Sequence, residues 1–173
     1  LRLILEHLST REGLAFVQAG PERLAGTLTA HHLLLSLDDL LGEGLEAHLF
    51  CKPVLKPAVH RDALRAAVFS GLPRLFFGSD SAPHPRVKKE SGRAPAGIYS
   101  APAALPALAG LFDQAGALDR LEPFLCSRGA DFYRLPRPRG QLTLVEEAWT
   151  VPDELDGCVP LLAGQTLAWK AIE

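Results

Sequence analysis

Residues 74–84 read RLFFGSDSAPH. Three large apolar residues run into a glycine, an aspartate and a proline-containing loop, which predicts a buried strand with an acid at its carboxyl end. Side chains alternate along a strand, so Phe76, Gly78 and Asp80 are expected on one face. Asp80 then projects beside a position without a side chain, where a metal ion or substrate can approach. A single aspartate here more often ends a strand and caps the next turn, so other residues must decide between the two roles.

The composition predicts a single globular domain. The chain has 173 residues, which is long enough to bury one core. Of these residues 22% are charged, which does not suggest disorder. A net charge of -2 with mixed signs offers no basic surface for nucleic acid, and no apolar run reaches the roughly 18 residues of a membrane span. Cys51, Cys126 and Cys158 lack paired spacing, so we expect no disulfides, no thiolate zinc site and a cytoplasmic location.

The amino-terminal half of the chain alternates strand-like and helix-like segments. Residues 1–7 predict a strand, and Ser9-Thr10-Arg11-Glu12 gives a capping-box pattern for a helix that runs to about Ala19. After Gly20 and Pro21, residues 24–35 predict a second strand that runs into a loop, and residues 47–55 predict a third. Residues 62–69 have the apolar spacing of a helix.

The remaining residues continue this alternation after the strand at 74–80. Residues 88–97 are polar and rich in glycine, which predicts a loop long enough to fold over a site. Residues 101–115 and 118–126 predict helices, with Pro102 in an opening turn and Pro106 at a kink. Residues 135–149 predict a crossing strand or tail, and residues 159–169 are expected to pack last.

Four strands separated mostly by helices predict an α/β fold with parallel strands. The polar, loop-forming residues follow the carboxyl ends of these strands. Doubly wound sheets and (β/α)8 barrels both place their chemistry there. The pattern alone leaves both architectures open. Because the chain begins at Leu1 with residues typical of a buried strand, and has no methionine, we expect a fragment of a longer protein.

Histidines gather near the predicted strand ends: His7, His31, His32, His48 and His84. Together with Asp80 they offer the imidazole and carboxylate ligands that suit zinc. However, H-x-H and H-E-x-x-H motifs are absent, and a single histidine at a strand end is more often structural. His31 and His32 point in opposite directions in an extended chain, so at most one is expected to face a site. His60, at a predicted helix start, is assigned to the surface.

Several segments, in order and spacing, resemble the class II dihydroorotases of the amidohydrolase superfamily: LEHLST, TLTAHHLLL, AHLFCKPVLK, FFGSDSAPHPRVKKES, AGIYSAPAAL and the closing LLAGQTLAW. The resemblance implies a (β/α)8 barrel with two zinc ions bridged by a carboxylated lysine and a hydroxide. It also implies the interconversion of N-carbamoyl-L-aspartate and L-dihydroorotate in pyrimidine synthesis, and a homodimer without nucleic-acid or membrane partners.

The resemblance assigns roles to five residues. His7 matches the strand-five histidine that binds the more exposed zinc, and Asp80 matches the strand-eight aspartate that binds the other zinc and carries a proton. His84 and Ala96 match positions that hold the substrate carboxylate. Lys52 falls where the family holds the dihydropyrimidine ring through backbone groups, although many members have leucine at this position.

What the chain lacks is equally informative. It has no H-x-H strand, no metal-bridging lysine, no strand-four histidine and no substrate-binding arginine or asparagine from the first strands. Residues 1–173 are therefore expected to be the carboxyl-terminal half of one barrel, with strands five to eight and the closing helices. Zinc sites need at least three protein ligands, so this half alone is expected to be inactive.

Two alternatives remain open. Another amidohydrolase, such as a hydantoinase, allantoinase or deaminase, shares the metal ligands His7 and Asp80, but a neutral substrate does not need the carboxylate-binding His84 and Ala96. A non-catalytic dihydroorotase-like assembly partner has no reason to keep His7 and Asp80 as a pair.

Overall fold

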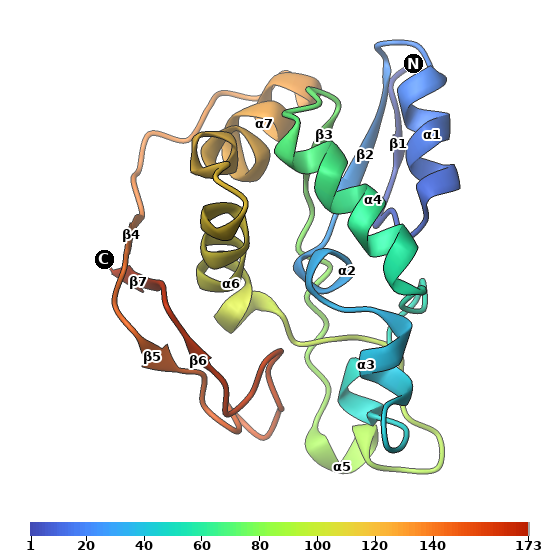
Figure 1. Ribbon diagram of the computed structural model, residues 1–173, viewed down its shortest axis with the longest axis vertical. Coiled ribbons are helices and arrows are strands. Elements are labelled where there is room, and N and C mark those ends of the chain that lie inside the picture. The colour runs from blue at the N-terminus through green and yellow to red at the C-terminus, as the bar shows by residue number, and fades with distance from the viewer. Residues whose placement is uncertain (173) are drawn as a thin grey trace.

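A three-stranded parallel sheet lies at the centre of the computed structural model, which describes residues 1–172 (Figure 1). Its strands are β1 (Leu3–Leu5), β2 (Leu24–Leu28) and β3 (Leu75–Phe77), in that spatial order. All of β2 is buried, as expected for the central strand of a parallel sheet covered on both faces. Parallel pairing at both junctions confirms the predicted α/β class.

Helix α1 (Arg11–Ala19) connects β1 to β2, as predicted, but with a different cap. The Thr10 hydroxyl accepts a hydrogen bond from the Gly13 N–H at 3.0 Å. The expected Ser9–Glu12 capping box does not form, because Glu12 is exposed and pairs with Arg11 at 2.8 Å instead. The helix predicted at residues 62–69 begins earlier, as α4 (Ala58–Phe69), directly after Pro57. A proline ring is compatible with a helix start, which explains the earlier beginning.

The predicted strand at residues 24–35 is half as long as expected. It ends at Leu28, and α2 (Ala30–Leu34) follows at once. Thr29 makes this switch, because its hydroxyl accepts a hydrogen bond from the His32 N–H at 3.1 Å and so caps the helix. A second short helix, α3 (Leu37–Leu41), comes next.

The predicted third strand at residues 47–55 is wrong. Its first residues form a 3-10 turn, η1 (Ala47–Leu49), in which Glu46 accepts a hydrogen bond from the His48 N–H at 3.2 Å. The rest is irregular, and Pro53 has no N–H to donate to a sheet ladder. Within residues 1–172 the parallel sheet therefore has three strands, not four.

The second half of the chain is mainly helical. Its helices are α5 (Arg86–Lys89), α6 (Ala101–Gln114) and α7 (Arg128–Tyr133). The predicted helix at 101–115 is confirmed as α6, with Pro102 in its first turn and Pro106 inside it. The helix predicted at 118–126 is broken into a 3-10 turn, η2 (Leu118–Arg120), and a π-helical turn, η3 (Pro123–Ser127).

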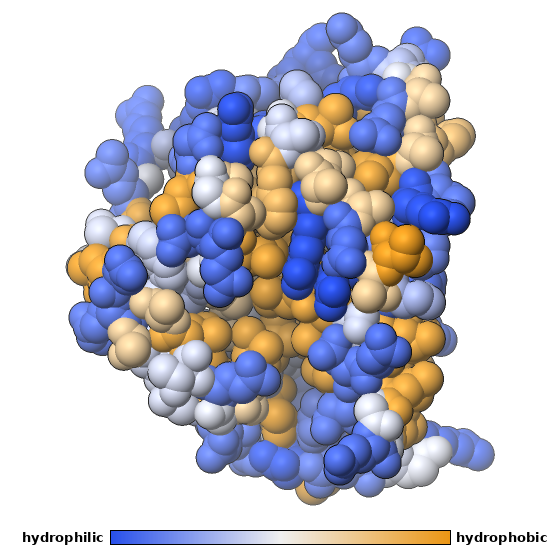
Figure 2. Space-filling model, viewed as in Figure 1, coloured by the Kyte–Doolittle hydropathy of each residue, from blue (hydrophilic) through white to orange (hydrophobic). Residues whose placement is uncertain are grey.

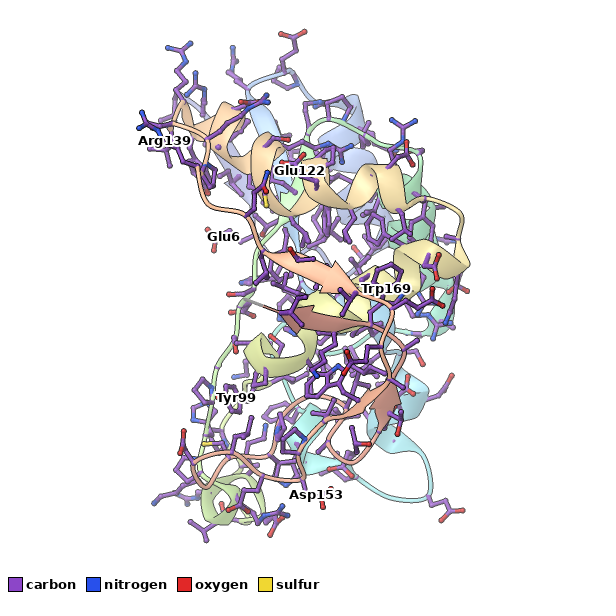
Figure 3. All side chains as sticks on the ribbon, turned by 90° about the vertical axis from the view of Figure 1, so that its left-hand side faces the viewer. Glu6, Tyr99, Glu122, Arg139, Asp153 and Trp169 are labelled. Carbon is purple, nitrogen blue, oxygen red and sulfur yellow. The ribbon has the colours of Figure 1, made fainter. Side chains whose placement is uncertain are left out.

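Two short antiparallel strand pairs finish the fold. Strand β4 (Thr143–Val145) pairs with β7 (Lys170–Ile172), and β5 (Trp149–Thr150) pairs with β6 (Thr166–Leu167). Strands β6 and β7 contact α6, which lies between them and the central sheet (Figures 1 and 3). The indole N–H of Trp149 donates to the Trp169 carbonyl at 2.8 Å, and the indole N–H of Trp169 donates to Asp113 of α6 at 3.4 Å, so the predicted tail is joined through Trp169 to the body of the protein.

The core lies between the sheet and these helices. Phe112 of α6 stacks on Phe124 of η3 with ring centroids 5.7 Å apart, and both rings are fully buried beside Leu28 and Leu108. Figure 2 shows further apolar atoms near the middle of one face, bordered by polar side chains. Among the described residues, no helix is long and apolar enough to cross a membrane.

Arg74, just before β3, binds the end of α1. Its Nη1 donates to the Gly20 carbonyl at 2.9 Å, and its Nη2 donates to the Gln18 carbonyl at 2.9 Å. The last carbonyls of a helix have no partners within the helix and attract cations. Arg74 thus fixes the amino end of β3 against the α1–β2 junction.

Both edges of the sheet are open within residues 1–172. Strands β1 and β3 each pair with β2 alone. On β1, Leu3 is 52% exposed and Leu5 is 38% exposed, although leucine is usually buried in a parallel strand. These residues form an apolar edge of the kind that pairs with further chain.

Candidate active site

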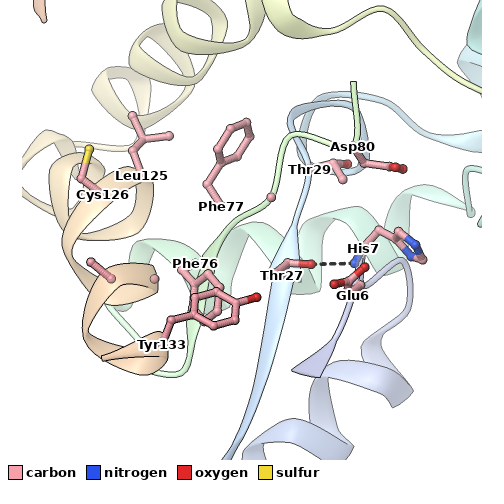
Figure 4. A pocket seen from close by; sticks show the side chains of 13 residues that line it. Glu6, His7, Thr27, Thr29, Phe76, Phe77, Asp80, Leu125, Cys126 and Tyr133 are labelled. Atoms are coloured by element: carbon pink, nitrogen blue, oxygen red, sulfur yellow. Dashed lines mark hydrogen bonds between the residues drawn. The ribbon is translucent and has the colours of Figure 1, made fainter. Parts of the chain in front are cut away.

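A cavity of about 380 Å³ opens where the sheet strands end (Figure 4). It is lined by residues that follow or belong to all three strands, and by residues of η3 and α7. The polar side chains at its wall are Glu6, His7, Thr27, Thr29, Asp80, Cys126 and Tyr133. This places imidazole, carboxylate and hydroxyl groups together at the carboxyl ends of parallel strands, where α/β proteins bind ligands.

His7 follows β1 and is held in an unusual backbone conformation. Its φ is +41°, which is rare for residues other than glycine. Its N–H donates to the Thr27 hydroxyl of β2 at 2.8 Å, which ties it to the central strand (Figure 4). The buried Nδ1 of its ring has no hydrogen-bond partner among the described residues. A buried nitrogen without a partner is unusual in a folded protein, and a bound ion or ligand is one explanation for it.

Asp80 stands in the matching position after β3. Its φ is also +41°, and its carboxylate is exposed at the cavity. Gly78 lines the same cavity, and a Cβ there would lie 3.0 Å from the Cβ of Thr27. A side chain at this position would therefore press on Thr27, which would have to shift by a few tenths of an ångström. Since β3 ends at Phe77, the predicted strand alternation does not extend to Asp80, whose direction is set by its own left-handed backbone.

His84 and Ala96 meet in a second group on the loops after β3. The Nε2 of His84 lies 3.1 Å from the Ala96 carbonyl. Gly97 follows with a φ of +148°, and a Cβ there would lie 2.7 Å from the Cβ of Ala82. Only glycine fits this close approach. The loop is joined to the segment after β3 because the Ala82 N–H donates to the Ile98 carbonyl at 2.9 Å.

Lys52 is exposed and does not line the cavity beside His7 and Asp80. Its segment nevertheless contacts the Ala96 loop, because the Gly97 N–H donates to the Phe50 carbonyl at 2.9 Å. The structure therefore brings the predicted residues together as two groups, with His7 and Asp80 in one and His84 and Ala96 in the other.

His31 and His32 do not line the cavity, which is consistent with the expectation that at most one of them would face a site. They lie on helix α2, not in extended chain, and both are buried with ring centroids 4.7 Å apart. His32 contacts the Thr29 hydroxyl through Nδ1 and the Pro53 carbonyl through Nε2, each at 2.9 Å. Desolvation lowers the pKa of His31 to about 3 and that of His32 to about 4, so both rings are neutral at pH 7.

Cys51 lies beside these two histidines, and one nitrogen or sulfur from each lies within 4.8 Å of the others. Its thiol donates to the Pro53 carbonyl at 3.2 Å, and burial raises the pKa of the thiol to about 11. Metal binding requires the thiolate, and it would also displace hydrogen bonds that His32 and Cys51 already make. His32 and Cys51 are thus accounted for as part of the core, whereas both ring nitrogens of His31 are buried without a hydrogen-bond partner among the described residues.

The other two histidines also differ from expectation. His48 lies on η1, not on a strand, and its Nε2 is 3.1 Å from the Glu90 carboxylate. His60 is only partly on the surface, because its Nδ1 accepts a hydrogen bond from the Arg11 N–H at 3.2 Å. Neither lines the cavity.

The ligand set at the cavity fits a metal ion in part. His7 offers an unpaired ring nitrogen and Asp80 offers an exposed carboxylate, which are zinc ligands. A catalytic zinc site usually has three protein ligands, and the two candidates at this cavity among the described residues are His7 and Asp80.

Sequence reasoning missed three residues of this region: Glu6, Thr27 and Lys89. Glu6 and Thr27 line the cavity, and only their positions beside strand ends could have indicated this. Lys89 was expected in an exposed polar loop but is 3% exposed. A lysine is almost never fully buried, so no pattern in the sequence pointed to it.

Comparison with known proteins agrees with this geometry. No protein-family model matches the chain. The D-hydantoinase of a Thermus species superposes with a TM-score of 0.78 over 97% of this chain and 42% of that one, at 16% identity, which shows the fold alone. The fold and the strand-end cavity thus define an α/β protein that shares its fold with this hydantoinase.

Two further matches are more specific. A dihydroorotase from Nitrosomonas eutropha is 50% identical over 174 residues, covering 98% of this chain and 50% of the relative. The crystal structure of Saccharomyces cerevisiae dihydroorotase in complex with 5-fluoroorotic acid has a TM-score of 0.89 and 33% identity, covering 99% of this chain and 51% of that one. The chain is homologous to the dihydroorotases and spans about half the length of the relatives it matches.

Proposed function

We propose that this chain is the carboxyl-terminal half, residues 1–173, of a dihydroorotase with a (β/α)8 barrel. In this proposal it supplies strands five to eight and the closing helices, with the irregular segment around Cys51 in the place of strand seven. The intact enzyme would interconvert N-carbamoyl-L-aspartate and L-dihydroorotate. The single observation that carries the proposal is the pairing of His7 and Asp80 at one strand-end cavity in a chain 50% identical to a dihydroorotase.

The residues at this cavity divide the chemistry between them. His7 and Asp80 would bind two zinc ions together with a carboxylated lysine and histidines from the amino-terminal half. When bound, the two zinc ions would supply a hydroxide nucleophile at neutral pH and polarise the reacting carbonyl. Asp80 would accept the proton of the attacking hydroxide and deliver it to the departing amide nitrogen, and it would reverse these transfers during ring closure. Its exposure at the cavity supports this role.

His84 and Ala96 would hold the substrate carboxylate. Their contact fixes both on one loop, and among the described residues nothing accepts a hydrogen bond from the Ala96 N–H. A free N–H and an imidazole are suitable donors for an anion. The segment at Lys52 would hold the dihydropyrimidine ring through backbone groups, which an exposed lysine side chain does not prevent.

This second group favours dihydroorotase over the two alternatives. A hydantoinase shares the fold, but a ring without a carboxylate has no use for the donors at His84 and Ala96. A non-catalytic assembly partner has no use for the unpaired His7 nitrogen or for the exposed Asp80. The role in pyrimidine synthesis and the homodimer stay predictions that follow from the resemblance, and the cytoplasmic location stays a prediction from the unpaired cysteines.

The experiment is a substrate panel with the full-length protein. We expect turnover of carbamoyl aspartate and dihydroorotate, with hydantoin and allantoin at least about a hundredfold slower in kcat/KM. This margin corresponds to about 3 kcal/mol of transition-state binding, the size of a charge-assisted hydrogen bond. Elemental analysis is expected to show two zinc ions per chain. Preferred turnover of hydantoin would favour the first alternative, and no turnover with no bound zinc would favour the second.

A further inference from the structure

Lys89, at the end of α5, is a buried cation without a carboxylate partner. It is 3% exposed, and its Nζ lies close to carbonyl oxygens rather than to an acid. It donates to Phe50 at 3.0 Å, to Pro95 at 3.1 Å and to Gly97 at 2.8 Å. A lysine ammonium has three protons, so these three bonds use all of them. Its ammonium also lies 5.9 Å from the centre of the Phe50 ring.

These three carbonyls belong to the two segments that carry the proposed substrate contacts. Pro95 and Gly97 flank Ala96, whose own carbonyl contacts His84 at 3.1 Å. Three consecutive carbonyls of the loop are therefore held, which leaves the Ala96 N–H as the free polar group. Phe50 lies two residues before Lys52, and its carbonyl also accepts the Gly97 N–H at 2.9 Å.

Burying a lysine is unfavourable unless its charge is well solvated by the protein. Desolvation lowers the pKa of Lys89, in keeping with this cost. The three carbonyl dipoles replace the lost water. An apolar side chain at this position would avoid the cost of burying a charge, but the three carbonyls would lose the hydrogen bonds from Lys89. We therefore attribute the presence of a lysine here to these hydrogen bonds.

We propose that Lys89 is a positioning residue that fixes the Ala96 loop against the Lys52 segment, so that the Ala96 N–H meets the substrate carboxylate. The effect of Lys89 on substrate binding rests on the proposed function. Its role in joining the two segments does not depend on that function. Lys89 touches no substrate in this assignment. Because the loop would bind the carboxylate equally in the ground state and the transition state, its loss acts mainly on KM.

The test compares Lys89→Met with Lys88→Met in the full-length protein. Lys88 is the matched control, since it is the exposed lysine of the same short helix. For Lys89→Met we expect KM for carbamoyl aspartate to rise at least about tenfold and kcat to fall less than threefold, the pattern of lost uniform binding. Lys88→Met is expected to keep both constants within twofold of wild type.

Hydrogen exchange gives a readout that does not depend on activity. The Gly97 amide is expected to exchange at least about tenfold faster in Lys89→Met than in wild type or Lys88→Met, because its loop is no longer held. If Lys89→Met does not fold, Lys89→Arg replaces it, since a planar guanidinium does not match three carbonyls held around one ammonium.

The outcomes separate the two proposals. A lowered melting temperature with unchanged KM and unchanged exchange at Gly97 would mean that Lys89 only stabilises the fold, and would overturn the inference. If wild type turns over no carbamoyl aspartate, the proposed function fails. In that case hydrogen exchange of the Gly97 amide is the only measurement that tests whether Lys89 holds the loop.

Discussion

His7 and Asp80 share a backbone conformation that few residues adopt. Both have a φ of +41°, and each follows a strand of the sheet on either side of Thr27. A left-handed conformation is unfavourable by about 1 kcal/mol or more for most residues other than glycine, although asparagine, aspartate and histidine adopt it more often than the others. Such strain persists where the surrounding structure requires it and gathers at functional sites. The resemblance singled out both residues, but no sequence pattern could show that their directions depend on left-handed backbone.

Replacing Asp80 by asparagine tests its proposed role. Asp80→Asn in the full-length protein removes a charged ligand and the proton carrier while keeping the size of the side chain. Loss of a general base alone lowers turnover about 10²-fold or more, so we expect less than about one hundredth of wild-type activity. Steady-state ring closure measures this, and an unchanged circular dichroism spectrum is the control for folding. More than about a tenth of wild-type activity would contradict the assignment.

Replacing His84 by alanine separates substrate binding from metal binding. A hydrogen bond to a carboxylate contributes about 1.5 to 3 kcal/mol, so KM for carbamoyl aspartate should rise roughly 10-fold to 150-fold. Zinc content should stay at the wild-type value, because the ring contacts Ala96 rather than the cavity wall. Loss of one zinc equivalent in elemental analysis would make His84 a ligand and the assignment wrong. His48→Ala is a suitable control, since His48 does not line the cavity.

The helices and strands show which sequence patterns are informative. The apolar runs at β1 and β3 and the amphipathic helix α1 were predictable, because periodicity and turn residues agree there. The strand predictions for residues 24–35 and 47–55 failed for another reason. Short apolar runs fit a strand or a buried helix equally well, and the hydrogen bonds that Thr29 and Glu46 accept from backbone N–H groups decided between them. In both segments a single capping residue had more influence on the backbone than the apolar pattern of the whole segment.

Helix α2 carries a pH dependence that the fold imposes. His31 and His32 have pKa values of about 3 and about 4 in the folded protein, against about 6.5 in an unfolded chain. Below pH 6.5 the unfolded state binds more protons, so the free energy of unfolding decreases as pH falls, down to about pH 4 for His32 and pH 3 for His31. At pH 5 each histidine should lower it by about 2 kcal/mol.

Urea unfolding of the full-length protein at pH 7 and pH 5 measures this effect. His31→Leu should reduce the difference in unfolding free energy between the two pH values by about 2 kcal/mol. The fully buried position of His31 accepts a leucine of similar size. His60→Gln is the control, because His60 is partly exposed. An equal pH dependence in His31→Leu and wild type would show that His31 is already hydrated or charged.

The whole molecule has an unfinished sheet. Strands β1 and β3 are open edges within residues 1–172, and the cavity beside them has only part of a zinc ligand set. The homology to chains about twice as long agrees with the proposed half barrel, in which a further half would supply neighbours for the edges and ligands for the site. Sequence reasoning reached this conclusion through the family resemblance, because composition and periodicity alone do not distinguish half a barrel from a small doubly wound sheet.

The 173 residues alone are therefore expected to associate. Open strand edges and the exposed Leu3 and Leu5 of β1 favour pairing with other chains. Light scattering of the isolated fragment should show aggregates or oligomers, and calorimetry should show no sharp transition. Leu3→Lys should reduce the association, because a charge on an edge strand opposes pairing. A monodisperse monomer of the unmodified fragment with one cooperative transition would instead support a self-contained sheet.

The hydrogen bonds of Arg74 affect how accurately strand β3 is positioned along the sheet. Arg74 is bound to the last turn of α1 at the end of β3 that lies away from the cavity. A slip of β3 by one residue would displace Asp80 by about 3.3 Å, more than a proton transfer tolerates. Such a slip would also break the Arg74 bonds to Gln18 and Gly20. An arginine that never meets the substrate thus sets the position of the carboxylate at the opposite end of its strand.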